Sequence, residues 1–156
     1  MLKYTKILCA FEFDDNSIAA LHLAATLAKE SNATLYILHI TKVPNQDMDV
    51  PVPIDKNPRW ERDARTKLAR VAKKELAADI RIKLEVASGL PSVDIVRLAN
   101  ELDVDLIVMA THGRSGLMHF MMGSVTEEVI KEATCPVLVI RPSAETQKAR
   151  SETVTA

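Results

Sequence analysis

The sequence predicts an α/β protein in which helices cover both faces of a parallel sheet. Short apolar runs typical of buried strands alternate along the chain with segments whose apolar residues recur every three or four positions, as on one face of a helix. One run, at 104–110, is apolar almost throughout, which is typical of a strand covered on both faces. The chain has 156 residues, 47% of them hydrophobic, which is enough for one domain with a core.

The first two strands are predicted on either side of a helix. The first lies at 6–11, and the second lies at 33–40 and contains His39, which we expect to be partly buried and hydrogen-bonded. Residues 14–17 read Asp-Asp-Asn-Ser, residue types that cap helix starts. The helix is indicated by apolar residues spaced three and four apart, namely Ile18, Leu21, Ala25 and Ala28.

A proline-rich connection is predicted at 41–58. Its four prolines exclude a helix or a central strand, and long connections of this kind often serve as lids or contact surfaces. The helix that follows has a basic face from Arg62 to Lys74, which we interpret as solvated. Alternating apolar and polar residues at 80–88 then predict an edge strand with one wetter face. The apolar face of the helix is marked by Trp60, Ala64, Leu68 and Val71.

The last third of the chain repeats the alternation. Pro91 suits the first turn of a helix, and the apolar run at 104–110 gives the fourth strand. A fifth strand is predicted at 135–140, before a polar tail at 143–156. The buried faces of the two helices are indicated by Ile95, Leu98 and Leu102 and by Val125, Val129, Ile130 and Ala133.

The overall charge gives no sign of a polyanionic partner. Twenty basic and 21 acidic residues leave a net charge of −1, so no global field attracts nucleic acid or an anionic membrane. No apolar run reaches the roughly 18 residues of a membrane-spanning helix, and the charged first residues do not suit a secretory leader. Cys9 and Cys135 are interpreted as buried thiols. We therefore expect a cytoplasmic protein without nucleic-acid or membrane partners.

The segment at 109–129 is the strongest candidate for a functional site. It holds three of the chain's four glycines and leaves the carboxyl end of the fourth strand, where parallel sheets bind ligands. Glycine lets a backbone approach a ligand closely, and a helix start offers unpaired N–H groups to an anion. Ser124 and Thr126 could add hydroxyl groups, and Arg114 a fixed positive charge.

The same residues also allow an interpretation without a ligand. Ser124 and Glu127 have the spacing of a capping box, which would close the helix start with the protein's own side chains. Two familiar phosphate motifs are missing: no lysine follows a glycine as in a P-loop, and the first strand is not followed by a glycine-rich dinucleotide fingerprint. Spacing alone leaves both interpretations open.

The segment resembles the universal stress protein family, whose nucleotide-binding members carry G-x2-G-x9-G-[ST] after the fourth strand. Here that frame reads Ala110-Thr-His-Gly113, nine residues, and Gly123-Ser124. The resemblance covers 3–142, so we expect a family domain at 1–142 and a separate tail. It implies a Rossmann-like nucleotide-binding α-hydrolase fold, with a five-stranded parallel sheet of order 3-2-1-4-5. It also implies a homodimer through the last strand, Pro136 to Ile140.

The resemblance further implies a site for ATP, ADP or AMP. Its departures are Ala110 in place of the first glycine and Glu12 in place of an aspartate. Glu12 could still accept a hydrogen bond from a ribose hydroxyl or hold Mg²⁺ through water. The implied phosphate shell is Gly113, Arg114, Gly123, Ser124, Val125 and Thr126. The residues implied near the adenosine are Ala10, Phe11 and Glu12, with Ile40 packed on the base. The floor of the site is implied to be Met109, Ala110 and Thr111.

We therefore expect a cytoplasmic stress-response dimer that senses adenine nucleotides. Two alternatives stay open, a dimer that binds no nucleotide and works through protein contacts, and a slow ATP hydrolase. Phosphoryl transfer needs a positioned attacking group, and the sequence offers no convincing general base. We therefore name no catalytic residue and favour a binding module over an enzyme.

Overall fold

The computed structural model describes residues 3–42, 58–111 and 123–141. Within these ranges, strands and helices alternate strictly, and the strands form one parallel sheet in the order β3-β2-β1-β4-β5. The predicted fold class and strand order are therefore confirmed. The elements are β1 (Lys6–Ala10), α1 (Asp15–Ser31), β2 (Thr34–Lys42), α2 (Pro58–Glu75), β3 (Arg81–Gly89), α3 (Pro91–Leu102), β4 (Leu106–Ala110), α4 (Ser124–Glu132) and β5 (Val137–Ile140).

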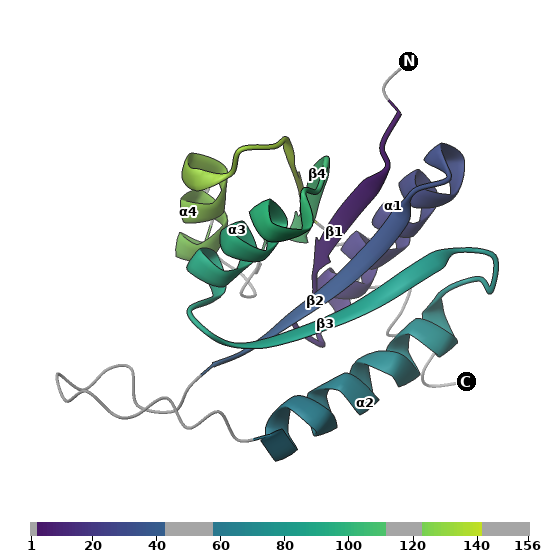
Figure 1. Ribbon diagram of the computed structural model, residues 1–156, viewed down its shortest axis with the longest axis horizontal. Helices are drawn as coiled ribbons and strands as arrows, with labels where there is room; N and C mark the ends of the chain where they lie inside the picture. Colours follow the sequence, from purple (N-terminus) through teal and green to yellow (C-terminus); the bar gives the residue numbers. More distant parts are fainter. Residues whose placement is uncertain (1–2, 43–57, 112–122, 142–156) are drawn as a thin grey trace, which may run out of the picture.

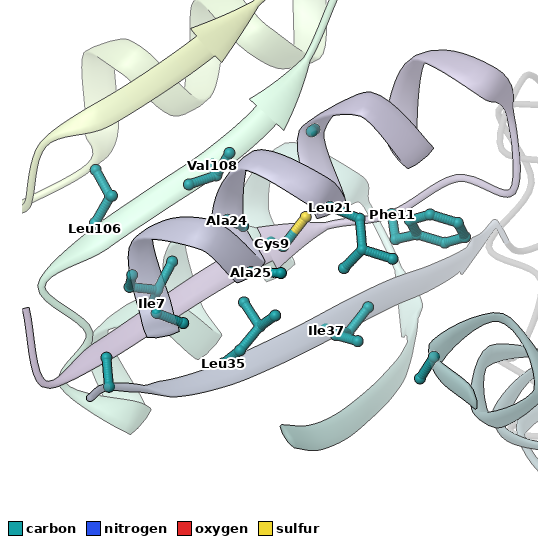
Figure 2. Close-up of a cluster of buried hydrophobic side chains, with 14 of the residues drawn as sticks. Ile7, Cys9, Phe11, Leu21, Ala24, Ala25, Leu35, Ile37, Leu106 and Val108 are labelled. Carbon is teal, nitrogen blue, oxygen red and sulfur yellow. The ribbon is translucent and has the colours of Figure 1, made fainter. Parts of the chain in front are cut away.

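The sheet is covered by two helices on each face (Figure 1). Side chains that alternate along a strand point to opposite faces, so β1, β2, β4 and β5 contribute residues to two cores, whereas β3 contributes to one. In Figure 2, Ile7 and Cys9 of β1, and Phe11 just after it, point toward Leu21 and its neighbours on α1. The opposite core joins the other strand residues to α3 and α4, and its members include Leu8, Tyr36, Ile107, Ile95 and Val129.

The buried and exposed strands follow the sequence pattern. Residues 106–109 of β4 are all buried, and β3 lies at an edge of the sheet with alternating exposure in its first half. Asp14 is the N-cap of α1, as its residue type predicted. The segments 43–57 and 142–156 lie outside the described residues, and no helix in the described ranges is long and apolar enough to cross a membrane.

Several details differ from the prediction. The second strand continues to Lys42, so the proline-rich connection is shorter than expected. Trp60 and Ile130, assigned to buried helix faces, are each 42% exposed, because the cores take the helix residues nearest the sheet, such as Leu68 and Val129. Cys9 is fully buried, and burial raises the pKa of its thiol to about 12, whereas Cys135 is half-buried; both cysteines are free.

Candidate functional site

The sheet has a topological switch point between β1 and β4. The chain passes from β1 outward through β2 to β3, and then crosses to the other side of β1 to form β4 and β5. Open α/β sheets bind ligands beyond the carboxyl ends of the two strands at such a point. Here those ends are Ala10 and Ala110, and α1 begins shortly after Ala10.

The start of α4 is open in the sense that no described side chain caps it. Its N-cap is Gly123, which has no side chain to bond to the helix amides, and Ser124 is already the first helical residue. Within the described chain, the amides of Ser124, Val125 and Thr126 donate no hydrogen bond, and the first helical bond joins the Glu127 amide to the Gly123 carbonyl at 3.1 Å. The capping box on Ser124 does not form, because the helix begins one residue too early for it.

The position that a side chain of residue 123 would occupy is free of described protein atoms. A methyl group built on Gly123 would have no described neighbour within 4 Å. Ser124 is exposed, Val125 is half-buried and Thr126 is 3% exposed, so Ser124 is the hydroxyl available on the surface. Gly113 and Arg114, the other two residues of the expected phosphate shell, lie outside the described residues.

The loop between β1 and α1 is held by its own hydrogen bonds. The Glu12 amide donates to Ser17 Oγ at 3.0 Å, and the Ser17 amide donates to Asp14 Oδ1 at 2.7 Å. These bonds leave the Glu12 side chain exposed at the end of β1. The side chain of Phe11 is 1% exposed and lies in the core, so Phe11 contributes only backbone to this edge.

An aromatic cluster lies beside this loop, and only its histidine had been anticipated. His39 Nδ1 donates to the Phe11 carbonyl at 2.8 Å, since a carbonyl oxygen only accepts. Burial lowers the pKa of His39, so a neutral imidazole is favoured. The Phe13 ring lies 4.6 Å from the His39 ring, and Lys67 Nζ lies 4.4 Å above Phe13.

The end of β4 forms the floor between these regions. Thr111 is 5% exposed; its amide donates to the Ile140 carbonyl at 2.9 Å, and its carbonyl accepts from Asn16 Nδ2 at 3.3 Å. Ala110 is not among the described residues with positive φ, so alanine is compatible with its backbone there. Met109 is 4% exposed in the core, and Ile40 is half-buried near the end of β2.

No competing metal site occurs at these strand ends within the described ranges. The described ranges hold no group of three or more histidine, cysteine or acidic residues that could bind a metal ion. A groove of about 510 Å³ lies on α2, and no strand end contributes to its lining. That groove is lined by Arg62, Arg65, Thr66, Ala69, Arg70 and Lys73.

Comparisons with known proteins agree with this architecture. Universal stress protein YxiE of Bacillus subtilis is 37% identical over 148 residues, which cover 88% of this chain and 99% of YxiE. A universal stress protein solved in complex with cAMP has a TM-score of 0.66 at 24% identity, covering 91% of this chain and 100% of its own.

A second solved structure, the universal stress protein of Archaeoglobus fulgidus in complex with dAMP, has a TM-score of 0.62 at 22% identity, over 89% of this chain and 99% of its own. The family model for universal stress proteins matches residues 3–141, almost the whole chain. The protein therefore belongs to the universal stress protein family.

Proposed function

We propose that this protein binds an adenine nucleotide, ATP, ADP or AMP, at the carboxyl ends of β1 and β4. The observation that carries the proposal is the open start of α4, where the amides of Ser124, Val125 and Thr126 have no acceptor within the described chain. A helix start carries a partial positive charge and unpaired N–H groups, and phosphate satisfies both. The start of α4 lies at the carboxyl-terminal end of the strands, where the switch point between β1 and β4 predicts a ligand.

The phosphate side of the site rests on the absence of a side chain at Gly123. Open space at that position allows phosphate oxygens to reach the backbone amides, and the exposed Ser124 can donate its hydroxyl. The family resemblance adds Gly113 and Arg114 to this shell. Arginine would suit the role, because its planar fork binds phosphate through two parallel hydrogen bonds.

The adenosine side rests on the ends of β1 and β2. Glu12 places an exposed carboxylate at the end of β1, where it can accept hydrogen bonds from ribose hydroxyls. Ile40 offers an apolar side chain for the base. Glu12 provides a single carboxylate, so a Mg²⁺ ion there would be held mainly by phosphate oxygens and water, as Mg²⁺ prefers.

The relatives support this ligand class. The two solved family members named above are complexes with cAMP and with dAMP, both adenine nucleotides. We further propose a cytoplasmic stress-response role in a homodimer. β5 is an edge strand of four residues, and pairing Pro136 to Ile140 with a second copy would cover that edge.

Two other functions remain to be separated from nucleotide sensing. One is a dimer that works through protein contacts with an empty site, and the other is slow ATP hydrolysis. Mass spectrometry of the supernatant from denatured, purified protein decides the first alternative. We expect ATP, ADP or AMP at close to one per subunit, or calorimetric binding of ATP with Mg²⁺ to the emptied protein. The absence of both would leave the protein-contact module.

A substitution at Gly123 tests where the phosphates lie. Gly123→Val should weaken ATP binding by at least about a hundredfold, because a branched side chain would occupy the phosphate position. The change meets no described protein atom, so the loss of unfolding free energy should stay near 1 kcal/mol, the usual effect at an N-cap. Ile130→Ala on the exposed side of α4 is the control and should bind normally.

Normal ATP binding by Gly123→Val would show that the phosphates lie elsewhere. The same variant addresses hydrolysis. ATP turnover that survives further purification and disappears in Gly123→Val would favour a hydrolase, whereas turnover that persists in a variant that no longer binds ATP belongs to a contaminant.

A further inference from the structure

Phe13, in the loop between β1 and α1, has a backbone conformation that its residue type disfavours. Its φ is +59°, in the left-handed region that large side chains rarely adopt. The other described non-glycine residues with positive φ are Asn32 and Asp103, which are C-caps of helices, where this conformation is common. Phe13 is not a helix C-cap. Such strain persists only where the surroundings fix the conformation, and it concentrates at functional sites.

Four contacts fix the Phe13 conformation. His39 from β2 donates a hydrogen bond to the carbonyl of Phe11, two residues before Phe13. The Phe13 ring packs edge-on against the rings of Phe11 and His39, with centroids 5.3 and 4.6 Å away. Lys67, on α2, places its ammonium group 4.4 Å above the Phe13 ring, an attractive cation–π distance.

These contacts surround the residue that the proposed site needs. Glu12 lies between Phe11 and Phe13, and its amide is already used by Ser17 Oγ. The direction of the exposed Glu12 carboxylate therefore depends on how its two neighbours are held. Because the contacts come from β2 and α2, they also connect this loop to parts of the fold outside the proposed phosphate shell.

We infer that His39, Phe13 and Lys67 form a lock that holds the β1–α1 loop in its strained conformation and so presets Glu12 for the nucleotide, with His39 as the positioning residue. The inference rests on the proposed function for its final step. Its first step, the locked loop, is a property of the protein without ligand and can be measured separately.

The test compares His39→Leu with His39→Asn in the full chain. Leucine keeps apolar bulk but cannot donate, whereas the asparagine side-chain amide can replace Nδ1–H as the donor to the Phe11 carbonyl. We expect His39→Leu to raise hydrogen exchange of the amides at 11–13 about tenfold, the range of one net hydrogen bond. It should weaken ATP binding about two- to threefold, as far as loss of the Glu12 carboxylate does. His39→Asn should leave both measurements at their wild-type values.

A second pair of variants tests whether the Phe13 ring holds the loop. Phe13→Gly relieves the positive φ but removes the ring, so we expect faster loop exchange and weaker ATP binding. Asp103→Gly is the matched control: it relieves the same kind of conformation at the C-cap of α3 and should change neither measurement. Nitrogen NMR of His39 should find the proton on Nδ1, as the bond to a carbonyl requires.

The outcomes are distinguishable. Unchanged exchange at 11–13 in His39→Leu, or a proton on Nε2 alone, would overturn the lock whether or not nucleotide binds. Faster exchange with unchanged ATP affinity, in a protein whose wild type binds ATP, would overturn the link to the site. A wild type that binds no adenine nucleotide would overturn the proposed function and the link together, while the exchange data would still decide the lock.

Discussion

Helices α1 and α4 begin at the carboxyl ends of two neighbouring strands, β1 and β4, yet their first turns are built differently. At α1, the Asp14 carboxylate accepts from the Ser17 amide at 2.7 Å and places a negative charge at the helix start. At α4, the N-cap is Gly123, which has no side chain, and no described group accepts from the first amides. One helix start is capped by the protein's own side chain, and the other has no cap within the described residues.

Under the proposed function, the start of α1 serves the fold and the start of α4 serves a ligand. A capping carboxylate stabilises a helix and occupies the place that an external anion would take. Leaving α4 without one gives up that stabilisation and keeps the place free. We therefore expect substitutions at the start of α1 to change mainly stability, and substitutions at the start of α4 to change mainly nucleotide binding.

The largest contrast between the region of α1 and the region of α4 is expected in cysteine reactivity. Cys9 lies under α1, and burial raises its pKa from 9.0 to about 12, so its thiolate fraction falls about a thousandfold. Cys135, before β5, is half-buried. A thiol reagent should label Cys135 in the native protein and Cys9 only as fast as the protein unfolds. Rapid native labelling of Cys9 would show that the core under α1 is open.

Removing the cap of α1 sharpens the contrast in stability. Asp14→Ala should lower the free energy of unfolding by about 1–2 kcal/mol, because the helix loses an N-cap. Ser124→Ala, one position past the N-cap of α4, should change it by less than about 0.5 kcal/mol while weakening ATP binding severalfold. Urea unfolding and calorimetry measure the two effects; equal losses of stability would remove the distinction between the helix starts.

A smaller effect, in the region of α1, concerns the pH dependence of the free energy of unfolding. Burial lowers the pKa of His39 in the folded protein below its ordinary 6.5; the nearby Lys67 ammonium lowers it further, while the Phe11 carbonyl and the Glu12 carboxylate oppose the shift. As pH falls below 6.5, the unfolded chain therefore binds more protons at His39 than the folded protein does. The contribution of His39 to the free energy of unfolding is present above pH 6.5 and is lost as pH falls toward the pKa of the folded state.

The pH dependence of the difference in unfolding free energy between wild type and His39→Asn isolates that contribution. We expect the wild type to lose stability relative to the variant as pH falls below 6.5. A difference that stays constant across that range would mean that the pKa of His39 is not lowered in the folded state.

The smallest effect is expected at Glu12. Glu12→Asp restores the shorter carboxylate of the family pattern and should change ATP affinity by about two- to threefold, with tighter binding if the extra methylene now misplaces the oxygen. Glu12→Gln should weaken binding by a similar factor, because a neutral amide is a poorer acceptor. Titration calorimetry of the pair checks this; identical affinity in all three proteins would place the ribose away from Glu12.

Much of the fold could be predicted from the sequence because the burial of a strand determines the pattern of apolar and polar residues along it. The continuous apolar run became β4, which is buried at 106–109, and the alternating run became the edge strand β3. Strand order came from the family resemblance, since periodicity does not tell which strands pair. Trp60 and Ile130 were misplaced because helical spacing marks a face but not how much of it the sheet covers.

The candidate site was only partly predictable. The glycine pattern indicated the start of α4, but whether Ser124 capped the helix depended on one residue of register, which the sequence does not fix. Phe13 carries no signal for a left-handed backbone, because phenylalanine is not a residue type that favours it. The bond from His39 to Phe11 joins residues 28 positions apart, and only the pairing of β1 with β2 brings them together.

The most direct test of the difference between the two helix starts is Gly123→Asp, which gives α4 the type of cap that α1 has. The new carboxylate should bond to the first amides and leave the free energy of unfolding equal or higher by a few tenths of a kcal/mol. The same carboxylate should repel phosphate and weaken ATP binding by at least about a hundredfold, as measured by calorimetry against the neutral variant Gly123→Asn. Wild-type affinity for ATP in Gly123→Asp would contradict the assignment of these amides to the nucleotide.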